Sequence, residues 1–216
     1  MPARFAVTGT TPAGEATSNA TLEGLTITPD GRRIIAAMEG ALSGDVAPTG
    51  DATAHRMPFY SRGHRGNWAV TGQIAYRTET GQRIPDVLAY DNNDLLVEEA
   101  SFATAAGNAV SLYAVTGVDR APDVASVVKL STAPARDFLP KTLVSNLVDC
   151  PTLGAPALET QANPLLDNFE GMALTTPPLP FGYQGVTMIS DDNFSPAQHT
   201  RLLNLVLRLP RRARRK

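Results

Sequence analysis

The sequence contains little cysteine, little histidine and no long apolar run. Its one cysteine, Cys150, excludes an internal disulfide and a zinc site built from cysteines. The three histidines, His55, His64 and His199, form no His-Glu-x-x-His pattern, so we expect surface or packing roles for them. No segment reaches the roughly 20 apolar residues of a membrane span, and the N-terminal residues lack the apolar run of a signal peptide. We therefore expect a soluble chain without a membrane span, and the compartment stays open.

Motifs for nucleotide binding and serine hydrolysis are missing too. No glycine-rich phosphate loop that ends in Lys followed by Ser or Thr occurs in the sequence. Ser195 precedes His199 by four positions, but no Gly-x-Ser-x-Gly elbow surrounds it, and capping explains this serine better than nucleophilic catalysis.

Charge is distributed unevenly along the chain. The formal net charge is -2, from 19 Lys+Arg and 21 Asp+Glu. Six of the basic residues fall in the final stretch "RLPRRARRK", which leaves 13 basic against 21 acidic residues in the rest of the chain. An acidic body favours cations, or anions held through a bound cation, over direct nucleic-acid binding. The basic end is typical of a solvated chain terminus, with binding to an anionic surface as the alternative.

The pattern of the chain predicts an all-β fold. Hydrophobic residues make up 43% of the sequence, and 17 glycines and 17 prolines separate short apolar runs. The clearest unit is a β-hairpin with strands at Leu22 to Thr28 and Ile34 to Met38, joined by a turn at 29–31. Two similar hairpins follow, one around the turn "DNND" and one from "FEGMALTT" to "VTMISDDNF". Short strands at this spacing are typical of a sandwich or a propeller.

Four other segments have strand composition, and the C-terminal part has two interpretations. The four segments are "NWAVTGQIAYR", "NAVSLYAVTG", "ASVVKLST" and "KTLVSNLV". At the end of the chain, Ser195, Pro196 and Gln198 favour the start of a helix, whereas alternating leucines from Leu203 to Leu209 favour a strand. We predict a short turn followed by a closing strand.

Each hairpin carries acids at the end opposite its turn. In an antiparallel hairpin the start of the first strand lies beside the end of the second, so the heads and tails should meet. If the hairpins are arranged radially as blades, all the pairs lie on one rim. The expected pairs are Glu23 with Glu39, Asp86 with Glu99, and Glu170 with Asp191 and Asp192.

Carboxylates gathered on one rim favour a calcium site. They repel one another unless a cation compensates, and calcium accepts six to eight oxygen ligands in loose geometry. We predict that the strand heads Glu23, Asp86 and Glu170 bind the metal. We also predict that a metal held there activates water, with the acids at the strand ends as catalytic groups. The predicted catalytic residues are Glu39, Glu99, Asp191 and Asp192. The structural alternative is that each acid serves only in a strand-entry turn.

These segments resemble the phytase-like β-propeller family, described as having "esterase-like activity of phytase". The resemblance rests on "LEGLTITPDGRRIIAAMEGAL", "LLVEEASFATAAGNAVSLYAVTG", "NPLLDNFEGMAL" and "MISDDNFSPAQHTRLL", in that order. It implies a propeller fold and a hydrolase of phosphate esters or diesters, with a small phosphorylated substrate. The matching acids are the seven named above. Ala100 departs from the family pattern, which usually has arginine after the glutamate.

Length is the larger departure, because family members are typically longer and exported. At about 40 to 50 residues per blade, the chain has room for about four blades of a larger propeller. We therefore predict a partial propeller domain at 1–209, a basic tail at 210–216, and self-association through an exposed blade edge. The alternative functions are a non-catalytic binding or scaffold module and an inactive truncated remnant.

Overall fold

The computed structural model describes residues 1–9, 14–175 and 179–210. Within this part of the chain the regular structure consists of β-strands and short 3-10 helices, so the prediction of an all-β fold is confirmed. The strands are β1 (Leu22–Ile27), β2 (Arg33–Met38), β3 (Ala54–Arg62), β4 (Trp68–Arg77), β5 (Val87–Asp91), β6 (Asp94–Ala103), β7 (Gly107–Thr116), β8 (Lys141–Asn146), β9 (Phe169–Thr175), β10 (Tyr183–Ser190) and β11 (Leu202–Arg208). The 3-10 helices are η1 (Ala3–Phe5), η2 (Val118–Arg120), η3 (Leu130–Thr132), η4 (Ala135–Asp137), η5 (Leu147–Asp149) and η6 (Pro180–Gly182).

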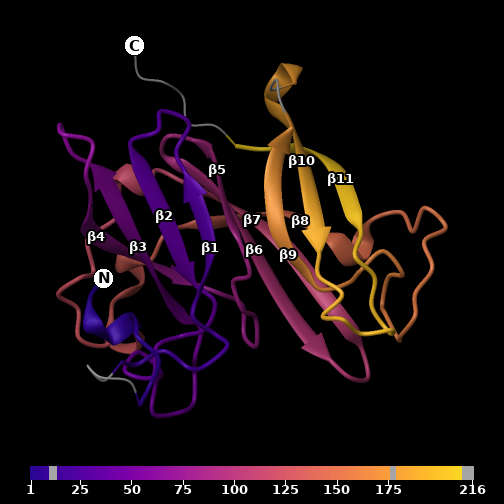
Figure 1. Cartoon of the computed structure of the whole chain (residues 1–216), viewed down its shortest axis with the longest axis horizontal. Helices are drawn as coiled ribbons and strands as arrows, with labels where there is room; N and C mark the ends of the chain where they lie inside the picture. Colours follow the sequence, from indigo (N-terminus) through magenta and orange to yellow (C-terminus); the bar gives the residue numbers. More distant parts are fainter. Residues whose placement is uncertain (10–13, 176–178, 211–216) are drawn as a thin grey trace.

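The strands form three antiparallel sheets that follow one another along the chain (Figure 1). The first has the order β1-β2-β3-β4, the second β5-β6-β7-β8, and the third β11-β10-β9. Strand β5 contacts both β1 and β9, so the first strands of the three sheets lie side by side. Each sheet therefore runs outward from a common line of first strands.

The three predicted hairpins are confirmed, and local turn chemistry explains the first of them. Thr28 donates its hydroxyl to Asp30 at 2.6 Å, and Asp30 in turn accepts the backbone N–H of Arg32 at 3.0 Å. Gly31 has a φ of 66°, in the left-handed region that glycine adopts without strain. The turn reverses the chain and pairs Ile27 with Ile34.

Two apolar layers hold the sheets together. The layer between the first and second sheets contains Ile35, Ile74, Val87 and Val97, which are buried. The layer between the second and third sheets is built in the same way; its members include Leu96, Leu112, Phe169, Val186, Met188, Leu203 and Leu207. Period-two alternation places these side chains on the inward faces of their strands.

The structure corrects three sequence-based expectations. The segment "ASVVKLST" is no strand; it forms loop and the helix η3, where Leu130 is buried. Strand β3 was not predicted, although the C-terminal strand β11 was. The described residues form three sheets rather than about four blades, because the connections 39–53, 117–140 and 147–168 consume the residues of a further sheet. Residues 211–216, most of the predicted basic tail, lie outside the described part of the chain.

Candidate functional site

The starts of β1, β5 and β9 bring three acidic residues to one end of the molecule. The β1–β2 and β9–β10 turns lie toward the top of Figure 1, so the starts of β1 and β9 lie at the lower end. Strand pairing sets Leu22 opposite Met38 and Phe169 opposite Ser190. Glu23 follows Leu22 and Glu170 follows Phe169, and Asp86 precedes Val87, the first residue of β5. We call these three acids, together with the neighbouring side chains of Glu39, Arg83, Glu98 and Asn168, the acidic site.

Glycine allows the first strands to approach closely here. A β-carbon at Gly24 would lie 3.0 Å from the backbone nitrogen of Val87 and 3.1 Å from the carbonyl carbon of Asp86. A larger residue at this position would push β1 away from β5. The Glu-Gly step therefore brings Glu23 next to the second sheet.

Arg83 supplies positive charge inside the acidic site. Its guanidinium donates to Glu39 Oε1 at 2.8 Å and to Asn168 Oδ1 at 2.6 Å, and it lies 3.6 Å from Glu170 Oε1. The backbone of Arg83 pairs with Ala100 in both directions, at 2.8 and 3.0 Å. Arg83 thus joins acids from the first and third sheets while its backbone is fixed to the second.

Glu23 has a pKa raised to about 7. Partial burial is the main cause, followed by the nearby negative charges of Glu39 and Glu170. Arg83 opposes this shift but does not cancel it. At neutral pH the Glu23 side chain is therefore present in both the protonated and the ionised form, as proton transfer requires.

Asp86 links β5 to β9 through its carboxylate. Its two oxygens accept the backbone N–H groups of Val87 at 2.8 Å and Met172 at 2.7 Å. Burial raises the pKa of Asp86 to about 6, although these hydrogen bonds favour the ionised form. Asp86 therefore has a structural task at the acidic site.

Glu98 is fully buried, and neither of its carboxyl oxygens has a hydrogen-bond partner. Burial raises the pKa of Glu98 well above its ordinary value, and the charges of Asp86 and Glu170 raise it further, against the effect of Arg83. One oxygen of Glu39, Oε2, is likewise buried without a partner. These unpaired acceptors point into a group that already carries negative charge, which is costly unless protons or a ligand compensate.

The predicted pairing of Asp86 with Glu99 is wrong, because the neighbouring residue Glu98 takes that place. Successive side chains of a strand point to opposite faces, so only one of the two glutamates can face the acidic site. Glu99 accepts hydrogen bonds from the Tyr76 hydroxyl at 2.6 Å, the Glu79 backbone N–H at 2.8 Å and the Lys141 ammonium at 2.6 Å. Glu99 therefore connects the first and second sheets on the face of β6 opposite the Glu98 side chain.

Asp191 and Asp192 stabilise the loop after β10. Asp191 accepts the backbone N–H of Asn193 at 3.1 Å, and Asp192 accepts that of Phe194 at 2.9 Å and the Thr200 hydroxyl at 3.0 Å. The backbone of Asp191 also lies beside Asn168, to whose carbonyl it donates at 2.9 Å. The expected approach of these side chains to Glu170 is therefore replaced by local turn contacts. Catalytic roles for Asp191, Asp192 and Glu99 stay predictions.

Of the seven predicted site residues, the structure brings together Glu23, Glu39, Asp86 and Glu170. Sequence reasoning missed Arg83, Glu98 and Asn168. Arg83 precedes Asp86 by three residues, and Asn168 precedes Glu170 by two, so proximity to the strand heads was an available signal. The choice between Glu98 and Glu99 required the register of β6.

The acidic site as described does not have the ligand arrangement of a calcium site. Among residues 1–9, 14–175 and 179–210, no group of three or more His, Cys, Asp or Glu side chains is placed to hold a metal ion. The Asp86 oxygens accept backbone N–H groups, and Arg83 already lies between Glu39 and Glu170. Calcium binding by Glu23, Asp86 and Glu170 stays a prediction, and we derive no chemical step from it.

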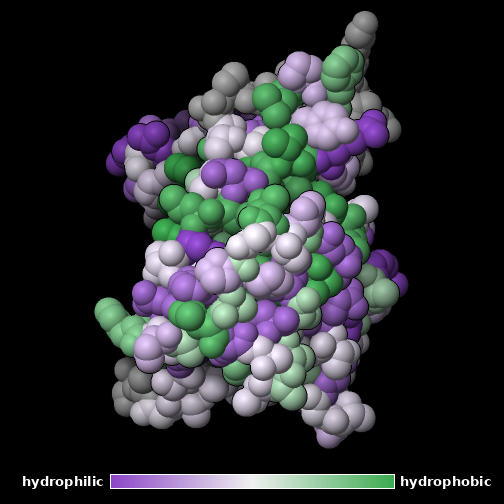
Figure 2. Space-filling view, turned by 90° about the vertical axis from the view of Figure 1, so that its right-hand side faces the viewer, coloured by the Kyte–Doolittle hydropathy of each residue, from purple (hydrophilic) through white to green (hydrophobic). Residues whose placement is uncertain are grey.

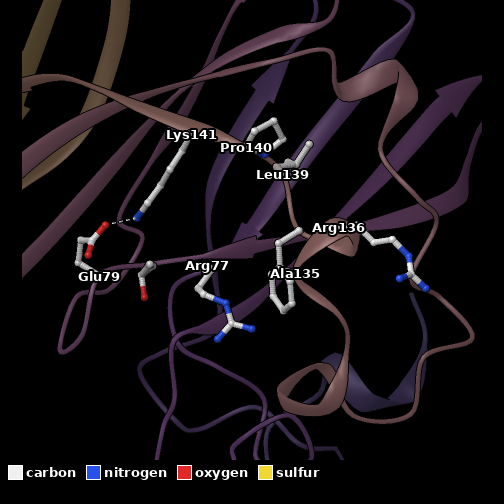
Figure 3. Close-up of a pocket in the computed structure, with 9 residues that line it drawn as sticks. Arg77, Glu79, Ala135, Arg136, Leu139, Pro140 and Lys141 are labelled. Carbon is white, nitrogen blue, oxygen red and sulfur yellow. Dashed lines mark ion pairs between the residues drawn. The ribbon is translucent and has the colours of Figure 1, made fainter.

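A pocket of about 550 Å³ opens on the outer side of the first two sheets (Figure 3). Arg77 covers the Phe138 ring at 4.1 Å, and Lys141 pairs with Glu79 at 2.9 Å. Arg136 points away from Arg77 in Figure 3. Since Lys141 also pairs with the buried Glu99, and Arg77 lies 3.8 Å from Asp51, acids compensate these cations. We assign no ligand to this pocket.

The fold and the acidic site define an all-β protein in which carboxyl groups and one arginine gather where three sheets meet. A family model described as "Phytase-like: Esterase-like activity of phytase" matches residues 1–194. The chain belongs to this phytase-like family, as the sequence motifs predicted.

Two further comparisons give less information. A search of curated proteins found no match. The solved structure of the periplasmic gluconolactonase PpgL of Pseudomonas aeruginosa is similar at 12% sequence identity, with a TM-score of 0.32. The alignment covers 100% of this chain and 64% of that chain, so the present chain spans less than two thirds of its length.

No helix in the described part of the chain is long and apolar enough to cross a membrane.

Proposed function

We propose that the three sheets are blades of a β-propeller and that the chain is a hydrolase of phosphoric esters, with its chemistry at the acidic site. The family description supports the hydrolase class. The side-by-side first strands β1, β5 and β9 support the blade arrangement, because the first strand of each propeller blade lines the central axis. The observation that carries the proposal is Arg83 beside a glutamate whose pKa is about 7.

Arg83 is the proposed phosphate ligand. Its side chain is 27% exposed, so a phosphoryl oxygen can approach it from solvent. Glu39 and Asn168 hold the group in place through hydrogen bonds at 2.8 and 2.6 Å. A guanidinium presents several N–H donors in a fixed plane, which matches the oxygens of a phosphate ester.

Glu23 is the proposed group for proton transfer. With a pKa of about 7, its ionised form can take a proton from an attacking water, and its protonated form can give one to the leaving alcohol. Glu170, 3.6 Å from the same guanidinium and exposed in part, maintains the negative charge that raises the Glu23 pKa. Glu98 and Asp86 are both buried, so they contribute charge to the site without contacting the substrate.

A second function, a non-catalytic binding module, has specific support as well. Asp86 directs both oxygens to backbone N–H groups, and Glu39 directs one to Arg83, as acids in a structural network do. In that case the acidic site would bind a ligand without turnover.

Hydrolysis of p-nitrophenyl phosphate, bis(p-nitrophenyl) phosphate and phytate distinguishes the two functions. For a hydrolase we expect turnover of at least one substrate and a loss of about 100-fold in kcat/KM for Glu23→Gln and for Arg83→Gln. Glu79→Gln is the matched control: it removes the same charge from an exposed glutamate beside Lys141, and its kcat/KM should stay unchanged.

Parallel assays with calcium chloride and with a chelator test the metal prediction separately. Calcium-dependent turnover or thermal stabilisation that Glu23→Gln abolishes would support it. Turnover that is equal in wild type and Glu23→Gln would contradict the proposed role of Glu23. If none of the three substrates is hydrolysed but at least one of them still binds, the binding module is favoured.

A further inference from the structure

The positive charge of the acidic site lies between the first and third sheets. The Arg83 guanidinium donates to Glu39, directly after β2, at 2.8 Å and to Asn168, directly before β9, at 2.6 Å. It also lies 3.6 Å from Glu170 in β9. Oxygen atoms from two sheets, two of them carboxylate oxygens and one an amide oxygen, therefore surround the same cationic group.

These three oxygens are of the kinds that bind calcium. Calcium accepts about six to eight carboxylate, amide and water oxygens at about 2.3 to 2.6 Å in loose geometry. The three oxygens lie 2.6 to 3.6 Å from nitrogens of the guanidinium, so a metal ion in the space of that group would face the same atoms. A calcium ion and the guanidinium cannot share this space, because the two positive charges repel each other.

Asp86, one of the three acids predicted to bind calcium, is engaged elsewhere. Its carboxylate oxygens accept the backbone N–H groups of Val87 at 2.8 Å and Met172 at 2.7 Å, which connects β5 to β9. The site therefore differs from the predicted calcium site for two physical reasons. Arg83 fills the space between the acids of the first and third sheets, and backbone donors occupy the acid from the second.

The acidic site has more hydrogen-bond acceptors than donors, even with Arg83 in place. Glu98 is fully buried, and within the described part of the chain neither of its carboxyl oxygens has a hydrogen-bond partner; Oε2 of Glu39 also has none. Loss of the guanidinium would add Glu39 Oε1 and Asn168 Oδ1 to the unpaired acceptors. Buried acceptors without partners are costly, so the site without Arg83 would favour another cation.

We propose that Arg83 is a built-in cation that takes the place of a metal ion, and that Arg83→Gln opens a calcium site in this chain. The oxygens of Glu39, Asn168 and Glu170 that face the guanidinium become the calcium ligands. In the wild type the guanidinium supplies the charge, so the acidic site needs no metal. The calcium prediction made from the sequence gives the opposite expectation for the wild type. The inference does not depend on the proposed hydrolysis, because its readout is metal binding.

The side of the molecule formed by the third sheet offers calcium weaker sites. Figure 2 shows hydrophobic residues gathered over the upper half of this side and interspersed with hydrophilic ones lower down. In the loop after β10, Asp191 accepts the backbone N–H of Asn193, and Asp192 accepts that of Phe194. Backbone donors thus already use these carboxylates. A calcium effect that depends on Arg83 therefore reports on the acidic site.

Thermal unfolding with and without calcium tests the inference. In about 5 mM calcium chloride at pH 7, we expect the unfolding temperature of the wild type to change by less than about 1 °C and that of Arg83→Gln to rise by about 5 °C or more. Isothermal titration calorimetry should show calcium binding to Arg83→Gln that is at least about tenfold tighter than to the wild type.

Two variants serve as controls. Arg83→Lys keeps a positive charge in the acidic site, so calcium should not stabilise it. Arg201→Gln removes another partly buried arginine, 16% exposed against 27% for Arg83, which lies 3.5 Å from one acid, Asp167. Its unfolding temperature should fall, and calcium should not restore it, because a single carboxylate is left behind.

Each outcome of these measurements decides for or against the inference. Calcium stabilisation of the wild type would overturn it and support the calcium prediction. No calcium binding by Arg83→Gln, or an equal calcium response of Arg201→Gln, would overturn it as well. If Arg83→Gln is unfolded without calcium, circular dichroism during calcium addition replaces the thermal measurement. Refolding on addition would then support the inference, and failure to refold would contradict it.

Discussion

The two ends of the third sheet treat charge in opposite ways. At the lower end, carboxyl groups gather around Arg83, and the pKa values of Glu23, Asp86 and Glu98 are raised. At the upper end, Phe181 and Arg208 are exposed. Burial makes the charges at the lower end sensitive to pH, whereas solvent makes the charge of Arg208 at the upper end sensitive to salt.

This comparison separates two kinds of environment for charged groups in one small β protein. Groups whose pKa values are shifted suit proton transfer, and they require a fixed environment of packed strands. Groups that stay ionised in solvent suit attraction over distance, and they require only sequence and an exposed position. The lower end is accordingly built from strand starts and the upper end from a turn and a chain end.

The largest expected effect comes from Arg83→Gln. It leaves Glu39 and the carboxyls around it without their cation, so we expect a loss of about 2 to 3 kcal/mol in the free energy of unfolding, from urea titration at pH 7. Arg208→Gln removes the same charge from the exposed upper end and should change stability by less than about 0.5 kcal/mol. Equal effects of the two substitutions would remove the contrast between the ends.

Glu98 should give the wild type a pH-dependent stability. Its pKa is raised in the folded state, so its contribution is fully present below pH 4.5, the ordinary glutamate pKa, and is lost as the pH rises toward the folded value. Above pH 4.5 this one carboxyl should cost about 1.4 kcal/mol per pH unit. Glu98→Gln should therefore lack that part of the slope above pH 4.5.

Glu99 is the control for this prediction, because it is equally buried but has Lys141 and Tyr76 as partners. Glu99→Gln should lower the free energy of unfolding at pH 7, whereas Glu98→Gln should raise it. An unchanged pH slope in Glu98→Gln would show that this carboxyl is ionised in the folded protein.

A smaller effect concerns self-association. The face of the third sheet directed away from the core exposes Ile189, Leu202 and Val206, at 46%, 66% and 64%. Exposed apolar sheet faces and unpaired edge strands favour association. We expect a concentration-dependent mass in analytical ultracentrifugation, and an association constant about tenfold lower for Val206→Lys. A compact monomer at all concentrations would contradict the predicted self-association.

The smallest effect is expected for Phe181→Gly and Phe194→Gly. Phe181 and Phe194 are exposed and have positive φ, so replacement with glycine relieves backbone strain while it makes the unfolded chain more flexible. We expect changes in the free energy of unfolding below about 0.5 kcal/mol for both, measured by urea titration. A large loss in either variant would show that the ring packs in the folded protein.

Sequence alone predicted the hairpins and the acids that start their first strands, because both depend on local pattern. The turn at 29–31 and the alternation within Leu22 to Met38 are readable without tertiary information. The C-terminal strand was also predicted correctly, since alternating leucines decided against the capping signal at Ser195.

Tertiary packing decided the features that the sequence left hidden. Glu98 and Glu99 are adjacent and identical, and only the register of β6 against β5 determines which one faces Asp86. Asp191 and Asp192 had the expected position in their hairpin, but local backbone N–H groups compete for their oxygens. The role of Arg83 depends on contacts to three separated parts of the chain, which no local pattern records.

The pKa of Glu23 tests the account of the acidic site most directly. Carbon-detected NMR titration should show that the Glu23 carboxyl titrates at about 7 in the wild type and shifts to lower pH in Glu39→Gln and Glu170→Gln. Glu79→Gln should leave that titration unchanged. A Glu23 carboxyl that titrates near 4.5, with no response to either substitution, would contradict the proposed proton-transfer site.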